Sequence, residues 1–495
     1  MLFRLAAVLL GVAPFLLAEG LFVLFDVGRP DLHDDPFVGF RAVRPLFVPS
    51  EDGSRWEIPP ARQAFFRPES FAAAKGANEY RIFCLGGSTV QGRPFAIETS
   101  FTTWLELNLR LAEPRRTWEV VNCGGISYAS YRLVPILAEV LAHEPDLIVL
   151  YTGHNEFLED REYGSIRDMP GVLARPLERI ARTRTFNLLR EAYLRVRGSP
   201  RAAAPPGRPV LAAEADAMLD YQGGLAKYHR DESWRRGVLR HFGFNVGRMV
   251  QLSREAGVPL LLVNPVSNLR DCPPFKAQHR DGLTPSERRR WEALCGEATR
   301  ALGTDPRRAA KRLEQAVAID DRHAGAYYLL GKCCDAARRP DRAREAYLRA
   351  KELDVCPLRM LEPMHEALRR IARRTDTPLV DVRTLFERRS RDGIPGGYLL
   401  IDHVHPSIAG HRVIADALTD ELIRRGVVRP RGGWRQRQEP RAREHLSSLD
   451  AFYFAKGQER LKAVRKWAAG RATLVRPGAD GGDRPDEPTT QGAPR

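Results

Sequence analysis

Residues 81–89 read Arg81-Ile82-Phe83-Cys84-Leu85-Gly86-Gly87-Ser88-Thr89. The apolar run predicts a buried strand, and the two glycines that end it allow a tight turn that presents Ser88. A serine hydroxyl becomes a good nucleophile when a histidine takes its proton and a carboxylate orients that histidine. The chain supplies both groups more than 300 residues later, in the stretch Asp402-His403-Val404-His405-Pro406.

Four further apolar runs resemble the one that precedes Ser88, and each is bounded by Gly, Pro or Asp. Together, the five runs are residues 80–85, 119–123, 147–152, 260–264 and 379–382. Helical patterns separate them, and this alternation predicts an α/β sandwich with a central parallel sheet. Ligand sites in such sheets lie beyond the carboxyl ends of the strands. Ser88, the turn 124–127 and Asn155 all follow strand ends, so we expect them at one edge of the sheet.

Four segments in order, residues 81–92, 119–130, 146–156 and 402–405, resemble the four sequence blocks of the SGNH (GDSL-like) hydrolase family. The resemblance covers residues 78–284 and 356–425. It is strongest to the bacterial membrane-anchored members that carry a tetratricopeptide insert. It implies a three-layer α/β sandwich with a central parallel sheet and a serine hydrolase activity on ester bonds.

By this resemblance, Ser88 is the nucleophile, His405 the general base and Asp402 the carboxylate that orients it. Asp402 and His405 match the family's Asp-x-x-His, while Gly87 stands where the family has aspartate. The alternative for Ser88 is a helix cap without a catalytic role. His403 lies outside the motif, and a Gly-x-Ser-x-Gly elbow is absent because Val90 occupies its last position, which argues against the α/β-hydrolase family.

The oxyanion hole implied by the resemblance combines the Ser88 N–H, the Asn155 side chain and a backbone N–H of the second block. In that block the usual glycine position falls on Ser127, and Gly125 is the other candidate donor. The alternative for Gly125 is that it only shapes the turn. Residues 265–270 follow a strand end, and we expect them to line the substrate pocket together with Arg359.

The N-terminal residues 1–28 predict a signal anchor with one transmembrane helix. Leu5–Ala18 and Leu21–Phe25 are apolar, Arg4 precedes them and four aspartates follow. The positive-inside rule then places the catalytic domain on the periplasmic or extracellular side. A cleaved signal peptide is the alternative. Residues 29–77 form a membrane-proximal segment in this interpretation.

Two helical regions accompany the predicted hydrolase domain, which comprises residues 78–284 and 356–426. Residues 285–355 have the small and aromatic positions of a tetratricopeptide-like insert, with ordinary amphipathic helices as the alternative. Residues 427–495 read as a basic linker, a helix and a disordered tail.

The net charge of +16 comes mainly from arginines scattered along the chain, which gives no reason to expect nucleic-acid binding. The cysteines form no Cys-x-x-Cys pair, and we expect neither a metal nor an organic cofactor.

The function expected is that of a membrane-anchored serine esterase acting on an ester of an envelope glycan or lipid. One alternative is an O-acyltransferase that uses the same triad with a sugar hydroxyl as acceptor. The other is an inactive scaffold that binds partners through the helical insert. In either enzyme, residues 285–355 are the expected docking region for a protein partner.

Overall fold

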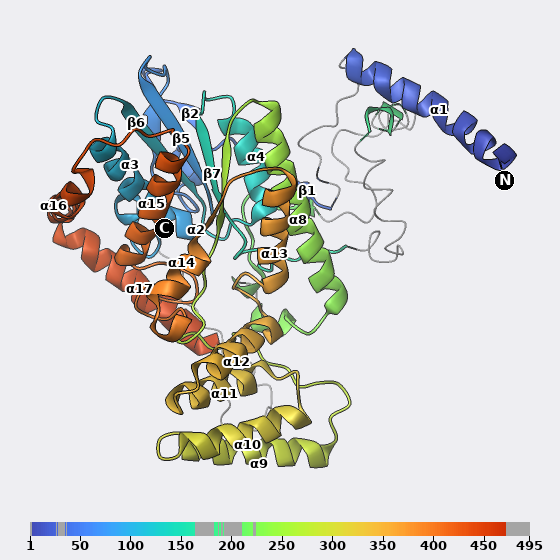
Figure 1. Ribbon diagram of the computed structural model, residues 1–495, viewed down its shortest axis with the longest axis vertical. Coiled ribbons are helices and arrows are strands. Elements are labelled where there is room, and N and C mark those ends of the chain that lie inside the picture. The colour runs from blue at the N-terminus through green and yellow to red at the C-terminus, as the bar shows by residue number, and fades with distance from the viewer. Residues whose placement is uncertain are drawn as a thin grey trace. The chain divides into compact units, whose positions relative to one another are not determined.

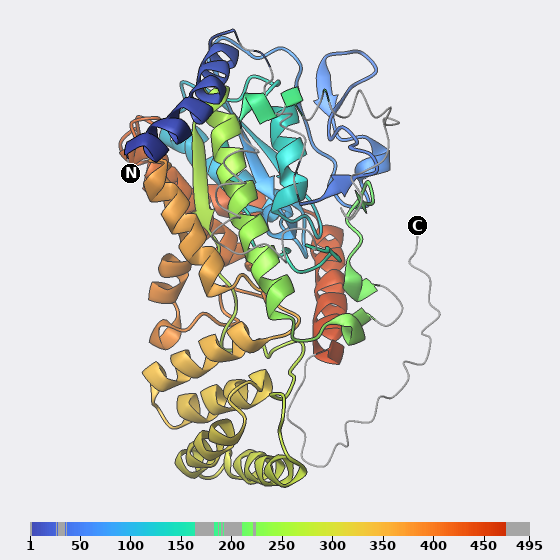
Figure 2. The same ribbon diagram turned by 90° about the vertical axis from the view of Figure 1, so that its right-hand side faces the viewer.

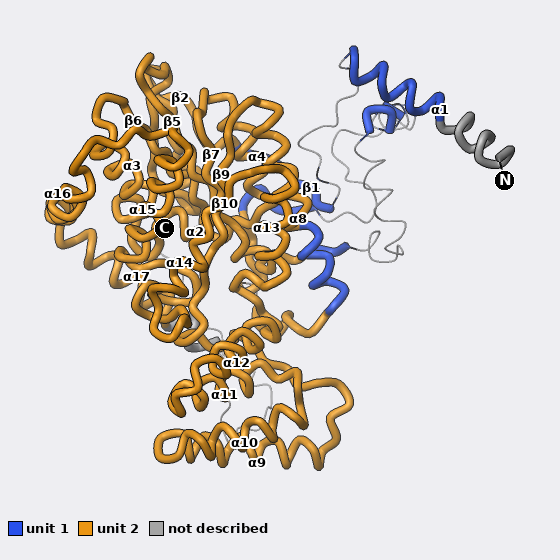
Figure 3. The backbone as a smooth tube through the Cα atoms, in the orientation of Figure 1, with its two compact units in different colours: residues 1–44, 161–214, 232–241 blue, residues 45–160, 215–231, 242–495 orange. Residues whose placement is uncertain are grey.

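The computed structural model describes residues 2–25, 27, 35, 37–163, 183–186, 188–189, 192, 210–220 and 224–471. The chain divides into two compact units (Figure 3). The first contains residues 1–44, 161–214 and 232–241, and the second contains residues 45–160, 215–231 and 242–495. The predicted disordered tail beyond residue 471 lies outside the described residues.

The second unit is built on a five-stranded sheet in which every neighbouring pair is parallel, in the order β10-β9-β7-β5-β6. In chain order the strands are β5 (Glu79–Gly86), β6 (Thr117–Gly124), β7 (Leu147–Tyr151), β9 (Leu260–Asn264) and β10 (Leu379–Asp381). All five predicted strands are confirmed. The register pairs Gly86 with both Gly124 and Tyr151, so three strands end at the same edge.

Helices cover both faces of this sheet and give the predicted α/β layers (Figure 1). On one face lie α3 (Phe101–Ala112), α14 (Val382–Arg389), α15 (Ile408–Arg424) and α16 (Trp434–Ser448). Their apolar side chains share one core with strands β5, β6, β7 and β9. On the other face, α4 (Ser130–Val140) contacts β5 and α13 (Glu362–Arg374) contacts β9. The short α2 (Ser88–Gln91) follows β5, and α8 (Glu232–Glu255) precedes β9.

Two small sheets contain the strands of residues 29–77, the segment predicted as membrane-proximal. Strands β2 (Val48–Pro49), β3 (Arg55–Glu57) and β4 (Ser70–Ala72) form an antiparallel sheet within the second unit. Within the first unit, β1 (Gly39–Phe40) pairs with β8 (Val210–Leu211) in parallel.

The predicted N-terminal span corresponds to α1 (Leu2–Leu24), which carries Pro14 in its interior. Among the residues that the structure describes, no helix combines the length and apolarity needed to cross a membrane. The transmembrane part of the fold prediction therefore has no support here, and the membrane location stays a prediction from the sequence.

The insert predicted at 285–355 consists of four helices in two consecutive hairpins: α9 (Pro285–Ala301), α10 (Pro306–Ile319), α11 (Ala324–Ala336) and α12 (Pro340–Leu353). Figure 2 shows these helices stacked below the sheet domain. Alanines and one glycine at the helix contacts let the backbones approach closely, and Tyr347 fills the groove beside Gly331. Both hairpins lie within the residues predicted as the tetratricopeptide-like insert.

The two ends of the insert are tied together by the Asp354 carboxylate. It accepts backbone N–H groups from Phe275 and Lys276 at 2.8 and 3.0 Å, where the chain leaves the sheet domain. It also accepts the Cys356 N–H at 3.1 Å, where the chain returns. The N–H of Val355 donates to the Lys276 carbonyl at 3.0 Å. We call residues 275–276 and 354–356, which these bonds join, the neck of the insert.

The region predicted as a basic linker after residue 427 contains α16, which is followed by α17 (Ala451–Arg471). The linker was predicted over residues 429–443, and the prediction is wrong for residues 434–443 because this stretch has tertiary partners that its composition does not reveal. Trp434 and Ala442 are buried in the core of the sheet domain. The Gln438 side chain donates to Asn108 on α3 at 3.0 Å, which anchors the polar face of the helix.

Gly331 provides a test of the packing within the insert. A Cβ atom at this position would lie 2.6 Å from the Tyr347 ring, so we expect Gly331→Ala to lower the free energy of unfolding by about 1–3 kcal/mol. Urea unfolding followed by circular dichroism measures the change. Gly303→Ala is the matched control, since no heavy atom lies within 4 Å of its Cβ position. Equal stability of the two variants would contradict the packing argument.

Candidate active site

Ser88 lies where β5 ends and α2 begins. Two glycines let the neighbouring backbone segments approach this point closely. Gly86 lies against the Tyr151 carbonyl and Gly124 against the backbone of Gln91, so neither position has room for a Cβ atom. Gly87 is extended and precedes the helix, which makes Ser88 the first residue of α2. The N–H of a first helical residue has no partner within its helix, so the Ser88 N–H remains available.

Asp402 and His405 lie in a tight turn that is held by its own backbone. The Ile401 N–H donates to the His405 carbonyl at 2.9 Å. One oxygen of Asp402, Oδ1, accepts the N–H groups of Val404 and His405 at 2.9 and 2.8 Å. These bonds fix the carboxylate relative to the histidine three residues later.

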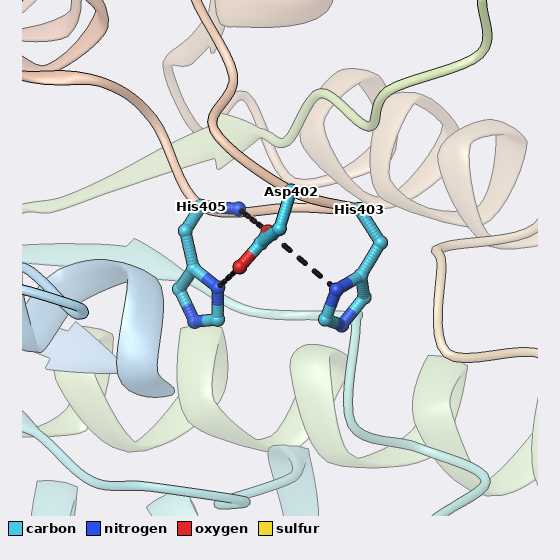
Figure 4. A group of neighbouring side chains, drawn as sticks. All are labelled: Asp402, His403 and His405. Atoms are coloured by element: carbon cyan, nitrogen blue, oxygen red, sulfur yellow. Dashed lines mark hydrogen bonds and ion pairs between the residues drawn. The ribbon is translucent and has the colours of Figure 1, made fainter. Parts of the chain in front are cut away.

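The structure brings Ser88, His405 and Asp402 into one chain of hydrogen bonds. Ser88 Oγ lies 2.8 Å from His405 Nε2, and His405 Nδ1 lies 2.6 Å from Asp402 Oδ2. Figure 4 shows the histidine and the carboxylate facing each other. The three residues are 5–9% exposed, so the chain is largely shielded from water. When the ring proton is on Nδ1 and directed at Asp402, Nε2 can accept a hydrogen bond from the Ser88 hydroxyl.

Asp402 is held in its ionised form. Burial disfavours the charge, but the nearby His405 and His403 and the hydrogen bonds from His405 lower the pKa of Asp402 below its ordinary value. An ionised carboxylate is the form that stabilises a protonated imidazole beside it.

His403 is the second histidine near this carboxylate, with Nδ1 at 3.5 Å from Asp402 Oδ1. Burial lowers the pKa of His403 to about 4, against the opposing effect of Asp402. Asp402, His403 and His405 each place one ligand-type atom within 4.8 Å of the others, a spacing that suits a metal ion. Both Asp402 oxygens, however, already accept hydrogen bonds from the turn and from His405.

Asn155, the predicted side-chain donor, lies close to the serine turn. Its Nδ2 donates to the Tyr128 carbonyl at 3.0 Å and lies 2.5 Å from the position that a Cβ on Gly87 would take. Glycine at position 87, where the resembled family has aspartate, therefore makes room for the Asn155 amide. Glu156 accepts the N–H and the hydroxyl of Ser130 at 2.7 and 2.9 Å and orders this loop.

The two backbone candidates of the second block differ in what their N–H groups do. The Gly125 N–H donates to the Gly86 carbonyl at 3.0 Å and is thus already engaged. Ser127 has φ of 63°, in the region that glycine favours, and its N–H has no acceptor within the described part of the chain. The geometry therefore favours Ser127 over Gly125 as a donor to a ligand.

Asn268 and Arg359 support the Asp402 turn from behind. The Asn268 side chain donates to the Asp402 carbonyl at 3.0 Å, and its N–H donates to the His403 carbonyl at 2.9 Å. Arg359 is 3% exposed and donates to the Asn268 carbonyl at 3.0 Å. We had expected both residues to line the pocket. The burial of Arg359 instead makes it a support, a distinction that strand ends in a sequence do not reveal.

Two other buried histidines near the site are held neutral. Burial lowers the pKa of His154 and of His411 to about 3 in each case. His154 Nδ1 accepts the Met360 N–H and His411 Nδ1 accepts the Phe101 N–H, both at 3.2 Å. Neither contacts Ser88, so within the described residues His405 is the histidine placed to act on it.

Comparison with protein families confirms the class of the insert, because the tetratricopeptide repeat model matches residues 304–355. No curated protein matches the chain. Among solved structures, similar ones include a lipolytic protein assigned to the G-D-S-L family from Desulfitobacterium hafniense DCB-2, at 11% identity and a TM-score of 0.30. That match covers 69% of this chain and 98% of the other.

Two acetylxylan esterases show the same level of likeness. Axe2 from Geobacillus stearothermophilus is 12% identical with a TM-score of 0.31, covering 71% of this chain and 96% of its own. AlAXEase is also 12% identical with a TM-score of 0.31, and the match covers 69% and 99% of the two chains. Because the sequence identities and TM-scores are this low, the proposed function depends on the geometry of the site itself.

The buried His411 predicts a loss of stability in acid. Its pKa falls from 6.5 to about 3 on folding, so the unfolded chain binds the proton first and stability decreases as the pH drops below 6.5. Between pH 7 and pH 5 the loss from this group is about 2 kcal/mol. We expect His411→Asn, which keeps an acceptor for Phe101, to unfold in urea with a correspondingly weaker pH dependence.

The exposed His229 provides the control for this measurement. His229→Asn should unfold with the pH dependence of the wild type. An unchanged pH dependence in His411→Asn would contradict this argument, because it would show that His411 binds a proton as readily in the folded chain as in the unfolded chain.

Proposed function

We propose that the chain is a serine esterase that hydrolyses an ester of a glycan or lipid, with Ser88 as nucleophile, His405 as general base and Asp402 as its orienting carboxylate. The observation that carries the proposal is the hydrogen-bond chain from Ser88 Oγ through His405 to Asp402, with distances of 2.8 and 2.6 Å. Those distances suit proton transfer without rearrangement of the three side chains.

In the proposed reaction Ser88 Oγ attacks the ester carbonyl carbon as its proton passes to His405 Nε2. The imidazolium formed is stabilised by Asp402. The tetrahedral intermediate collapses, the C–O bond to the alcohol breaks, and His405 returns the proton to the departing alkoxide. Water then attacks the acyl group on Ser88, again with His405 as base, and releases the carboxylic acid and the free serine.

The negative charge of each tetrahedral intermediate needs hydrogen-bond donors that are already in place. Three groups support this role in the proposal: the Ser88 N–H at the start of α2, the Asn155 amide above Gly87, and the Ser127 N–H. All three follow the carboxyl ends of neighbouring strands, which supports their use as donors at one edge of the sheet.

Covalent labelling tests the nucleophile. We expect a fluorophosphonate probe to label the wild-type chain and Ser88→Ala to lose all labelling, because the probe reacts with activated serines. Ser253→Ala is the control, since this serine is buried and its hydroxyl makes no hydrogen bond within the described residues. Retained labelling in a folded Ser88→Ala protein would remove Ser88 from the proposal, and an unlabelled wild type would reject the esterase assignment.

Replacement of Asn155 tests the oxyanion donor. We expect Asn155→Ala to reduce kcat for a 4-nitrophenyl ester about 100- to 1,000-fold with a small change in KM, since the amide acts on the transition state. Asn245→Ala removes a buried amide that makes no hydrogen bond to the described part of the chain, and it should leave kcat near that of the wild type. If Asn155→Ala raised KM alone, Asn155 would bind the ground state and would not stabilise the oxyanion.

A further inference from the structure

The loop of residues 268–272 connects the helical insert with the Asp402–His405 turn. Leu269 is buried and belongs to the apolar core of the insert. Asn268, one residue earlier, donates from its side chain to the Asp402 carbonyl and from its backbone N–H to the His403 carbonyl. We call residues 268–272 the bridging loop, because adjacent residues of this loop serve the insert and the candidate active site.

Helix α11 of the insert holds the middle of the bridging loop. The hairpin of α11 and α12 is the one that lies nearer the sheet domain (Figure 1). Tyr328 Oη donates to the Arg270 carbonyl at 3.0 Å. Asp335, in the last turn of α11, forms an ion pair with the Arg270 side chain at 2.8 Å. The insert therefore contacts both the backbone and the side chain of Arg270.

The peptide group between Arg270 and Asp271 links Tyr328 to Asn268. Its carbonyl accepts the Tyr328 hydroxyl, and its N–H donates to Asn268 Oδ1 at 2.9 Å. A peptide group is planar, so these two bonds change together. Because Asn268 Oδ1 accepts this N–H, Nδ2 is the end of the amide that donates to the Asp402 carbonyl at 3.0 Å. Three consecutive hydrogen bonds thus connect α11 to the residue that orients His405.

The groups at the start of this connection are held in the required state. Burial raises the pKa of Tyr328, so the phenol keeps the proton that it donates. The Tyr328 ring lies beside the Tyr347 ring, with 5.5 Å between the centroids. Hydrogen bonds in series strengthen one another away from water, so the loss of one weakens the rest.

Other contacts keep the backbone of the bridging loop in place without Tyr328. Arg359 donates to the carbonyls of Asn268 and Cys272 at 3.0 and 2.9 Å. The N–H groups of Leu269 and Arg270 donate to the Pro395 carbonyl at 3.0 and 3.1 Å. Removal of the Tyr328 hydroxyl should therefore leave the loop folded and loosen only the orientation of the Asn268 amide.

We propose that Tyr328 is a positioning residue of the active site, which holds the Asp402–His405 turn through the 270–271 peptide and Asn268 and so makes turnover depend on the helical insert. This inference rests on the proposed esterase function. Small errors in the placement of a catalytic group reduce its rate of reaction, so the orientation of His405 is the quantity that Tyr328 affects. A partner that displaced α11 would act on the triad by the same route.

The test removes the Tyr328 hydroxyl and keeps its ring. We expect Tyr328→Phe to lower kcat for 4-nitrophenyl acetate about threefold to tenfold, the effect of one hydrogen bond, with little change in KM. Tyr327→Phe is the matched control and should keep the wild-type kcat, since the Tyr327 hydroxyl makes no hydrogen bond within the described residues. In an Asn268→Ala background, Tyr328→Phe should have no further effect, because the connection is already broken.

Amide hydrogen exchange adds a measurement that needs no substrate. Peptides covering residues 268–272 and 401–406 should exchange about threefold faster or more in Tyr328→Phe than in Tyr327→Phe. An unchanged kcat of Tyr328→Phe in an active esterase, or its full effect in the Asn268→Ala background, would overturn the positioning role. If the wild type hydrolysed no ester, the proposed function would fail separately. Faster exchange would then still uphold the link between the insert and the turn, and equal exchange in the two tyrosine variants would overturn it.

Discussion

Close backbone approach at the carboxyl edge of the sheet is the constraint on which the rest of this structure depends. Gly86 and Gly124 let α2 lie directly on the ends of β5, β6 and β7. A side chain at either position would push the helix outward, and Ser88 would leave its 2.8 Å contact with His405. The absence of two Cβ atoms therefore sets the geometry of a site whose reacting groups come from opposite ends of the chain.

The Asp402–His405 turn shows how the second half of the site stays independent of the first. The Asp402 carboxylate is fixed by local N–H groups, and the Asn268 side chain donates to the backbone carbonyl of Asp402. The contact of His405 with Ser88 connects the two halves directly, and the Phe101 N–H, which donates to His411, connects them farther from the site. The intervening segment returns the chain to the same edge and also supplies Asn268, which holds the Asp402 turn through two hydrogen bonds.

The strands, and the proximity of Asp402 and His405, could be predicted because their signals are local: apolar runs between turn residues, and a carboxylate three residues from a histidine. Helix α16 could not, because its Arg-rich composition is typical of a linker and only the burial of Trp434 shows otherwise. The sequence could not decide between Gly125 and Ser127 as the backbone donor, since the choice depends on one hydrogen bond of the Gly125 N–H and on the positive φ of Ser127. The contact of Arg460 with the Phe95 carbonyl likewise depends on the packing of α17, which has no local signature in the sequence.

The neck of the helical insert has a consequence for how such chains can be remodelled. Because Asp354 binds Phe275 and Lys276 on one side and Cys356 on the other, the insert leaves and re-enters the sheet domain at one point. Once the neck is closed, the length between its ends has only a weak, logarithmic effect on chain entropy. A helical hairpin inserted or removed at this neck would change the exposed surface of the insert, while the strands of the sheet would keep their register.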